Sequence, residues 1–365
     1  SDIMPDLAIG RIPAKTAEEV SAVVAKTINY EQASIDAWQQ NLIFIADNTD
    51  AAGNFEAFSD ELALHYPPEG FTTDKFYVSN LCGTPPLNPC PALPEAIVNA
   101  LNTKSALFVN YTGHGAAAYW AASPIAFDRD KINLLTNKDR LPVILSWTCL
   151  DGFFFYPVRI DSYGASLNPS LAEKWLLSID KGGVATFSSA ALGVGTGHDF
   201  LAAGFYTSVF QNGNWNLGAA SLSAKANLFR TGIFFDLING YLVFGDPALQ
   251  IASSYRLSAA PAQQSGADIP GQIIHYTITV DNSGALDDSY YLTASGNNWP
   301  VGVPTLVGPV APGLQANVIV SVLVPATADA SDQDQVTINV ISKGDTRQVG
   351  SVQITTSVTS GSQSI

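Results

Sequence analysis

Two segments of the sequence contain residues whose types could perform nucleophilic chemistry. In Asn110-Tyr-Thr-Gly-His-Gly115, an apolar run leads directly into a histidine that lies between two glycines. In Pro142-Val-Ile-Leu-Ser-Trp-Thr-Cys149, a second apolar run ends at a cysteine. A thiol beside an imidazole becomes a nucleophile with its proton acceptor in place. The two segments therefore predict a pair formed by Cys149 and His114, on the condition that the fold brings them together.

The chemistry that such a pair performs most readily is acyl transfer. The Cys149 thiolate would attack a peptide carbonyl, and His114 would protonate the leaving amine. The backbone N–H groups of Gly115 and Cys149 could hold the oxyanion. Taken singly, Cys149 is more typical of a small buried apolar side chain and Gly-His-Gly of a simple turn. Their joint occurrence at the ends of consecutive apolar runs is what favours catalysis.

The elements that would position this pair follow from the pattern of residues 1–252. Apolar runs predict strands at 41–47, 75–79, 106–112, 142–148 and 184–189, and several of them are apolar throughout, as in strands buried on both faces. Helical periodicity between them predicts helices at 17–38, 55–66, 93–102, 170–179, 199–210 and 217–230, and Thr16 with Glu19 fits a capping box. Strands that alternate with helices predict an α/β fold with a parallel sheet. Ligands bind at the carboxyl ends of such strands, where His114 and Cys149 occur.

The remainder of the chain has a different pattern. From about residue 255 onward, helical periodicity gives way to period-two alternation with Ser, Thr, Gly and Pro. This pattern predicts a small antiparallel β-sandwich over 255–358, with the domain boundary near Ser253. The Ser/Gly-rich tail, 359–365, is expected to be flexible.

Composition excludes several classes of protein. A length of 365 residues indicates two domains, at roughly 100–200 residues each. A hydrophobic share of 47% excludes disorder, and 32 acidic against 17 basic residues make a nucleic-acid partner improbable. No apolar run is long enough to span a membrane.

The spacing of the cysteines and histidines bears on disulfides and metal sites. Cys82 and Cys90 bracket a Pro-rich loop, and either a disulfide or two free thiols fits them; we expect the disulfide, which would imply an oxidising, extracytoplasmic location. His65, His114 and His198 lie far apart in the sequence, and no zinc-binding spacing occurs.

Four stretches of the chain carry a family resemblance: Pro5-Asp-Leu-Ala-Ile-Gly-Arg-Ile-Pro13, Asn110-Tyr-Thr-Gly-His-Gly115, Ser146-Trp-Thr-Cys-Leu-Asp-Gly152 and Val243-Phe-Gly-Asp-Pro-Ala-Leu249. Together they resemble the gingipain-type cysteine peptidases, secreted bacterial relatives of the caspases. The resemblance spans residues 3 to about 252 and implies a caspase-like fold with His114 and Cys149 as the catalytic dyad. The segment after residue 255 is similar to the immunoglobulin-like modules of secreted bacterial hydrolases.

The resemblance further implies cleavage after arginine or lysine and suggests roles for three acids. Asp60 falls where arginine-specific members place the carboxylate of the S1 pocket, although an exposed acid on a helix face fits equally well. Asp199 lies near the loop that covers the pocket in the family, and a helix N-cap is its alternative. Asp47 is positioned like the acid that orients the histidine in some members, and its alternative is a loop acid at a strand end.

The sequence departs from the family in two places. Residues 189–198 contain glycines where the family has a tryptophan over the substrate side chain, so the P1 preference could differ. The chain also begins where the catalytic region is already under way, and we expect a first α/β subdomain and a propeptide in the full-length precursor. Gingipains bind calcium, so structural calcium is compatible with this acidic chain, although no D-x-D-x-D-G loop occurs. The chemistry itself requires no cofactor.

Two other functions fit parts of the sequence. One is an inactive peptidase-like scaffold that binds surface polymers, although such a protein would be expected to have lost His114 or Cys149. The other is a carbohydrate-binding role for the sandwich through Tyr290, Tyr291 and Trp299, although aromatic residues of this kind are more often part of a core.

Overall fold

The computed structural model describes residues 3–155 and 169–359. The chain divides into two compact units, Ser1–Ser253 and Ser254–Ile365. Residues 360–365 of the expected tail lie outside the described residues, so its flexibility stays a prediction.

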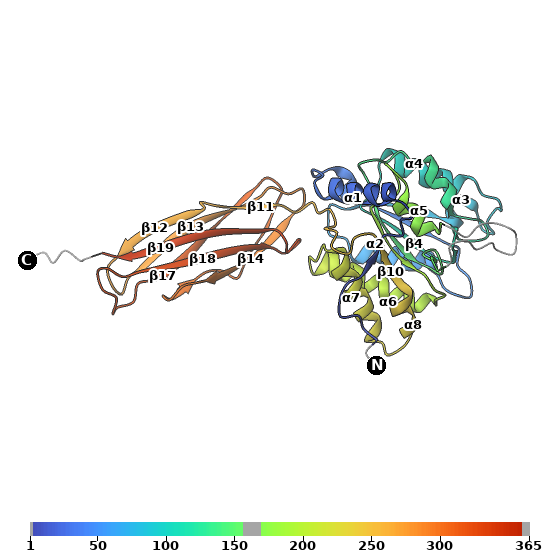
Figure 1. The fold of residues 1–365 in the computed structure, drawn as a ribbon. Coiled ribbons are helices and arrows are strands. Elements are labelled where there is room, and N and C mark those ends of the chain that lie inside the picture. Colours follow the sequence, from blue (N-terminus) through green and yellow to red (C-terminus); the bar gives the residue numbers. More distant parts are fainter. Residues whose placement is uncertain (1–2, 156–168, 360–365) are drawn as a thin grey trace, which may run out of the picture. The chain divides into compact units, whose positions relative to one another are not determined.

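The first unit is built on a seven-stranded, mostly parallel sheet (Figure 1). Across the sheet, the strands are β1 (Gly10–Arg11), β10 (Tyr241–Phe244), β9 (Ala185–Ser189), β8 (Val143–Trp147), β4 (Phe108–Thr112), β2 (Asn41–Ala46) and β3 (Thr72–Tyr77). Every neighbouring pair is parallel except β10 and β9, which are antiparallel. The five predicted strands are all present, and β3 begins three residues earlier than expected. The two strands that were not predicted, β1 and β10, are too short to show a periodicity.

Helices cover both faces of this sheet. They are α1 (Ala17–Glu31), α2 (Phe55–His65), α3 (Val78–Cys82), α4 (Ala92–Thr103), α5 (Leu171–Leu177), α6 (Gly195–Tyr206), α7 (Leu217–Phe229) and α8 (Phe235–Gly240). Figure 1 shows α1, α4 and α5 on one side and α2, α6 and α7 on the other. The capping box of Thr16 and Glu19 opens α1, which ends at Glu31 rather than at 38. The helix predicted at 199–210 begins four residues earlier and finishes in a π-helical turn, Thr207–Gln211.

Alternation along the central strands explains why both faces are covered. Ile43 and Ile45 of β2 pack in one core cluster with Ile97 of α4 and Trp175 of α5. Phe44, between the two isoleucines, points to the opposite face, where its ring lies 6.3 Å from that of Tyr206 in α6. Since both sets of side chains are buried, the sequence of β2 after Asn41 is apolar without interruption.

The second unit is an all-β sandwich of two sheets. One has the order β11 (Leu257–Ala260), β13 (Ile273–Asn282), β17 (Gln315–Leu323), β15 (Val301–Gly302). The other has the order β12 (Gln263–Asp268), β19 (Val349–Val358), β18 (Gln333–Ser342), β14 (Asp288–Ser295), β16 (Leu306–Val310). Inward residues of both sheets form one core cluster. The sandwich predicted for 255–358 is therefore present, with one pair, β12 and β19, that is parallel rather than antiparallel.

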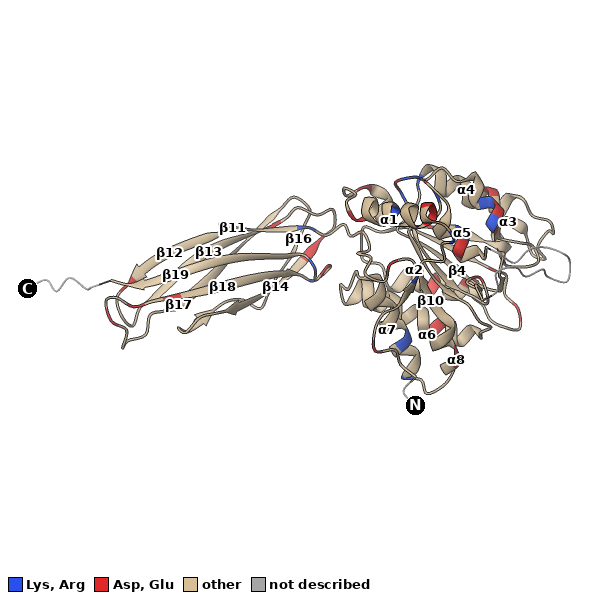
Figure 2. Cartoon of the chain, in the orientation of Figure 1, with Lys and Arg blue, Asp and Glu red and all other residues tan. Residues whose placement is uncertain are grey.

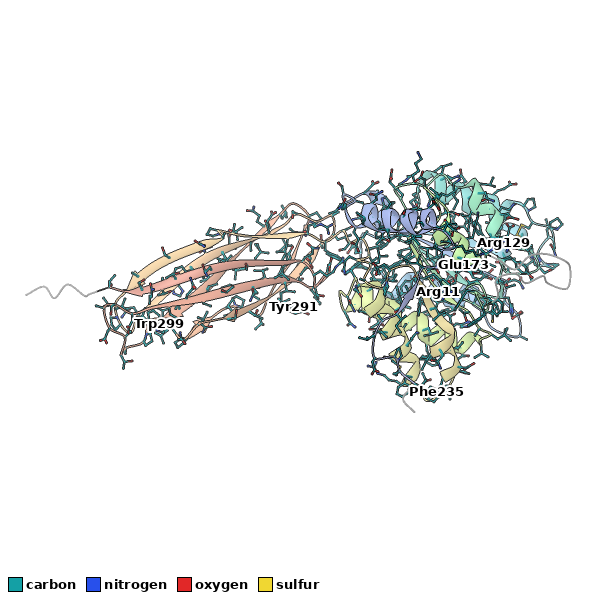
Figure 3. All side chains as sticks on the ribbon, viewed as in Figure 1. Arg11, Arg129, Glu173, Phe235, Tyr291 and Trp299 are labelled. Atoms are coloured by element: carbon teal, nitrogen blue, oxygen red, sulfur yellow. A yellow bond between two sulfur atoms is a disulfide. The ribbon has the colours of Figure 1, made fainter. Side chains whose placement is uncertain are left out.

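The aromatic residues of the sandwich do not form a flat exposed platform. Tyr290 is fully buried and Trp299 is 8% exposed, so both belong to the core. Tyr291 is exposed, and Figure 3 shows it well apart from Trp299. This arrangement favours the structural reading of these residues over sugar stacking.

The charged residues give no sign of a basic face. Lys and Arg are dispersed over several elements in Figure 2, and acids outnumber them 32 to 17. Among the described residues, no helix combines the length and the apolar character that crossing a membrane requires.

Candidate active site

The turns that follow β4 and β8 bring His114 and Cys149 to one edge of the sheet. Thr112 and Trp147 are paired in the parallel register of the two strands. His114 lies two residues beyond Thr112, and Cys149 lies two residues beyond Trp147. Both side chains line one pocket of about 230 Å³, together with Phe55 and residues of the 193–198 segment.

The backbone around His114 depends on the glycines on either side. Gly113 has a φ of 151°, and a Cβ atom there would overlap with Asp47 and with the hydroxyl of Tyr111. A Cβ atom on Gly115 would overlap with Thr148. These close approaches explain why glycines flank the histidine, and they leave the Gly115 backbone beside the residue that precedes Cys149.

A carboxylate orients the imidazole. The Nε2 atom of His114 lies 2.8 Å from Oδ2 of Asp50, and the His114 ring packs edge-on against Phe55 with 5.4 Å between centroids. Burial raises the pKa of Asp50, but the Ala52 N–H and the His114 side chain outweigh this effect and leave its pKa below the usual value. Asp50 is therefore placed to hold the imidazole in one orientation.

Asp50 makes the contact that we expected of Asp47. The carboxylate of Asp47 accepts hydrogen bonds from the backbone N–H groups of Asn48, at 2.8 Å, and His114, at 3.3 Å. It is buried, and burial raises its pKa. The expected role of Asp47 is revised accordingly: its carboxylate holds the histidine turn through the His114 backbone N–H, whereas the ring contact is made by Asp50.

The loop that follows β8 presents the sulfur of Cys149. Its Sγ accepts a hydrogen bond from the Gly193 N–H at 3.3 Å and lies 3.5 Å from the Gly193 carbonyl oxygen. The next residue, Leu150, has a φ of 60°, a left-handed conformation that is uncommon for a leucine and marks a sharp turn. Burial raises the pKa of the Cys149 thiol, and the Gly193 N–H offsets part of that effect.

The sulfur and the imidazole share a pocket without bonding to each other in this structure. Cys149 contacts Gly193, whereas His114 contacts Asp50 and Phe55. Catalytic hydrogen bonds are often long or absent before substrate binds. The two groups therefore face the same solvent-accessible space, the pocket that both residues line.

A second, smaller pocket adjoins the first and contains Asp199. It has a volume of about 90 Å³ and shares Phe55 and His198 with the pocket of Cys149. Burial raises the pKa of Asp199 to about 6, and no basic side chain among the described residues pairs with its carboxyl group. A half-buried acid without a cation is a suitable partner for a basic substrate side chain.

Asp60 lies outside both pockets. Its Oδ1 accepts hydrogen bonds from Lys75 Nζ, at 2.7 Å, and Tyr77 Oη, at 2.6 Å, both on the edge strand β3. Neither pocket beside Cys149 includes Asp60 in its lining. The expected S1 role of Asp60 is therefore revised, because its negative charge is already paired with a lysine.

Three residues of the site were missed by sequence reasoning. Asp50 lies four residues beyond β2 and could have been found as a second acid at that strand end. Gly193 and His198 belong to the glycine-rich segment, which offers no pattern that predicts contacts. His198 is 5% exposed, its Nε2 has no hydrogen-bond partner in the described structure, and burial lowers its pKa to about 4.

The remaining expectations concern the disulfide and metals. Cys82 and Cys90 are joined in a disulfide, and Cys149 is the free cysteine. Within residues 3–155 and 169–359, no group of three or more His, Cys, Asp and Glu side chains could hold a metal ion. Structural calcium stays an expectation.

Fold and pocket together define a class: an α/β protein with a cysteine and a histidine that line one pocket at neighbouring strand ends. The chain belongs to peptidase family C25, whose model matches residues 1–252. It is 28% identical to Gingipain R2 of Porphyromonas gingivalis strain W83 over 163 aligned residues. The aligned segment covers 43% of this chain and 21% of that protein. It is also 28% identical over 161 residues to Gingipain R1 of Porphyromonas gingivalis, which covers 43% of this chain and 15% of the relative. The matches thus span about a fifth or less of these relatives' length.

Solved structures show the same fold. The crystal structure of the Arg-specific cysteine proteinase gingipain R (RgpB) matches with a TM-score of 0.58 and 19% identity, over 98% of this chain and 76% of that one. The complex of the pro- and mature domains of Porphyromonas gingivalis RgpB matches with a TM-score of 0.57 and 19% identity. This match covers 98% of this chain and 78% of the chain in the complex. The expected resemblance to gingipains and the expected fold class are confirmed.

Proposed function

We propose that this protein is an active cysteine endopeptidase that cleaves peptide bonds after basic residues. The observation that carries the proposal is the shared pocket, in which Cys149 and His114 arrive from the ends of two paired strands. Cys149 attacks the scissile carbonyl, and His114 accepts the thiol proton and delivers it to the leaving amine. The negative charge on the carbonyl oxygen is held by the backbone N–H groups of Gly115 and Cys149.

Asp50 is the orienting acid in this mechanism. Its contact with Nε2 leaves the other ring nitrogen of His114 to exchange protons with the substrate and with Cys149. No cofactor is needed, because the thiolate, the imidazole and the backbone donors supply all the required groups.

The preference for a basic P1 residue rests on Asp199. Its carboxyl group lies in the pocket that adjoins the one with Cys149, and a P1 side chain would extend into that space while its carbonyl lies at the sulfur. A guanidinium or ammonium group there would gain a charge-assisted hydrogen bond. The Arg specificity named for gingipain R is consistent with this preference.

An extracytoplasmic location and a propeptide partner complete the proposal. The disulfide between Cys82 and Cys90 favours an oxidising compartment. The known complex of RgpB pro- and mature domains is a precedent for a propeptide that covers the site. Protein or peptide substrates follow from the family.

The decisive experiment compares the unsubstituted chain with Cys149→Ala. We expect the unsubstituted chain to hydrolyse arginyl and lysyl peptide amides and the variant to lose that activity, at least about a thousandfold, because the nucleophile is gone. Thermal unfolding of the variant should be nearly unchanged, since the half-buried sulfur loses only its weak hydrogen bonds with the Gly193 backbone. Undiminished turnover in Cys149→Ala would remove the mechanism. Absence of any cleavage by a folded, unsubstituted chain would favour the alternative of an inactive peptidase-like scaffold.

A further inference from the structure

Tyr111, the penultimate residue of β4, lies against the turn that carries His114. Its side chain is fully buried on the face of the sheet that packs against α4 and α5. Its hydroxyl group donates a hydrogen bond to the backbone carbonyl oxygen of His114, at 2.5 Å. A Cβ atom on Gly113 would lie 2.6 Å from the same hydroxyl oxygen. The tyrosine therefore contacts two consecutive residues of the histidine turn.

The ring of Tyr111 is fixed by the segment that follows His114. This segment forms a small three-stranded sheet of β5 (Gly115–Ala116), β6 (Tyr119–Trp120) and β7 (Phe127–Asp128). Gly115 pairs with Trp120 across β5 and β6. The indole of Trp120 stacks on the Tyr111 ring, with 4.7 Å between centroids and an interplanar angle of 9°. This stacking limits the freedom of the phenol ring and keeps its hydroxyl at the His114 carbonyl.

The backbone of His114 is held at both of its polar groups. The carboxylate of Asp47 accepts a hydrogen bond from the His114 N–H at 3.3 Å. The His114 carbonyl oxygen accepts one hydrogen bond from Tyr111 and another, at 2.8 Å, from the Ala121 N–H. By contrast, the His114 side chain is 49% exposed and bonds to the carboxylate of Asp50. Because packing encloses only half of this side chain, its position depends strongly on the backbone that carries it.

The Tyr111 hydroxyl links the histidine turn to the centre of the sheet. It projects from β4, which pairs with β2 on one side and with β8 on the other. Burial raises the pKa of Tyr111 well above its usual value, and the charge of Asp47 acts in the same direction. The hydroxyl group therefore keeps its proton and stays a hydrogen-bond donor at neutral pH.

We propose that Tyr111 is a positioning residue for His114, whose hydroxyl group holds the His114 carbonyl so that the imidazole faces the pocket of Cys149. The inference rests on the proposed role of His114 as the proton acceptor of the thiol. Proton transfer requires hydrogen-bonding reach between the groups that exchange the proton. A displacement of about 1 Å can lower the rate by about a hundredfold. Tyr111 is not among the residues that line the pocket, so it acts through the histidine.

A kinetic test compares Tyr111→Phe, which removes one oxygen atom, with Tyr30→Phe. Tyr30 of α1 is also buried, its hydroxyl accepts a hydrogen bond from the Ala252 N–H at 3.0 Å, and it lines neither pocket beside Cys149. We expect Tyr111→Phe to lower kcat for an arginyl amide about tenfold or more, with KM within about threefold, because the histidine is displaced and substrate binding is not affected. Tyr30→Phe should keep kcat. Both variants should lose similar thermal stability, since each loses a buried hydroxyl that is bonded to the backbone.

A second measurement reports the position of the imidazole and needs no peptide cleavage. The chain has four histidines, so the ring signals of the full chain with isotope-labelled histidine can be assigned by single substitutions. The His114 ring lies edge-on to Phe55, and the ring current of Phe55 makes the His114 chemical shift sensitive to position. We expect the His114 signal to move in Tyr111→Phe and to stay in place in Tyr30→Phe. The signal of His275 in the sandwich should stay in place in both variants.

A conservative replacement provides the rescue. Para-aminophenylalanine at position 111 keeps a hydrogen-bond donor at the end of the ring, and it should restore both kcat and the His114 signal. It also decides the matter if Tyr111→Phe does not fold, because a folded para-aminophenylalanine variant with a displaced His114 signal would contradict the proposal.

An unmoved His114 signal in folded Tyr111→Phe would overturn the proposal, as would an equal loss of kcat in Tyr30→Phe. These outcomes are separate from the fate of the proposed function. If the unsubstituted chain cleaves no peptide but the His114 signal moves in Tyr111→Phe, the peptidase activity alone is contradicted.

Discussion

At the scale of single residues, the direction of a side chain decides which acid serves the histidine. Asp47 and Asp50 are three residues apart, yet one binds the backbone of His114 and the other binds its ring. Sequence position could place an acid near the strand end, but it could not choose between these two. The same limit applies to Asp60, whose charge is paired with Lys75.

The two acids should therefore respond differently to substitution. Asp50→Asn removes the charge that stabilises a protonated imidazole, and we expect kcat/KM for an arginyl amide to fall about tenfold or more with little change in thermal unfolding. Asp47→Asn should instead lower the thermal stability, because its buried carboxylate accepts two backbone hydrogen bonds. Glu69→Gln, an exposed substitution, serves as the control. If the kinetic loss followed Asp47→Asn and not Asp50→Asn, the assignment of the orienting acid would be reversed.

The pKa of Asp199 predicts how selectivity depends on pH. With a pKa of about 6, the carboxyl group is mostly ionised at pH 7 and mostly protonated at pH 5, so its ionised fraction falls about tenfold. We expect KM for an arginyl substrate to rise over this interval, while KM for a substrate with an uncharged P1 residue stays nearly constant. An arginyl side chain bound to Asp199 would lower the pKa of its carboxyl group, which would therefore stay ionised in the enzyme–substrate complex. For this reason kcat should depend less on pH than KM. Asp199→Asn should abolish the difference between the two substrates; a pH-dependent difference that survives in this variant would assign the specificity to another group.

At the scale of elements, the strands that could be predicted are those buried on both faces. Their side chains must be apolar on both faces of the sheet, so a continuous apolar run in the sequence predicts such a strand. β1 and β10 have two and four residues, which is too short for a periodicity to show in the sequence. The loop with Gly193 was equally unpredictable, since its contact with Cys149 spans 44 residues of sequence.

The disulfide stabilises one local segment of the first unit. Cys82 and Cys90 are eight residues apart, and closure of so short a loop accounts for about 2–3 kcal/mol of the free energy of unfolding. We expect the double variant Cys82→Ser, Cys90→Ser to lose that amount of unfolding free energy, which would appear in urea denaturation as a lower midpoint. Activity per folded molecule should be preserved, because neither cysteine lines the pocket of Cys149. A double variant as stable as the parent chain would show that the disulfide contributes nothing to the free energy of unfolding.

At the scale of the whole molecule, the chain contains separate cores. One cluster includes Ile144 in the sheet of the first unit, and another includes Ile338 in the sandwich; both side chains are fully buried. Because each core is assembled from residues of one unit only, the two units should unfold as distinguishable transitions.

A matched pair of substitutions tests this separation. Ile144→Ala and Ile338→Ala each remove the same atoms from a fully buried site and should cost about 2–5 kcal/mol. In scanning calorimetry, each variant should lower one transition and leave the other in place. Two variants that shift the same single transition equally would show that the units unfold together.

The amino-acid sequence by itself determined the five buried strands of the sheet, most of the helices that cover them, the sandwich and the candidate pair of Cys149 and His114. Apolar runs and glycines are local features, and they dictate local structure wherever they occur. Only the tertiary structure decided which acid contacts the imidazole, which acid lines the pocket next to that of Cys149, and which backbone N–H binds the sulfur. These contacts join residues far apart in the chain, and their geometry depends on the packing of several elements at once.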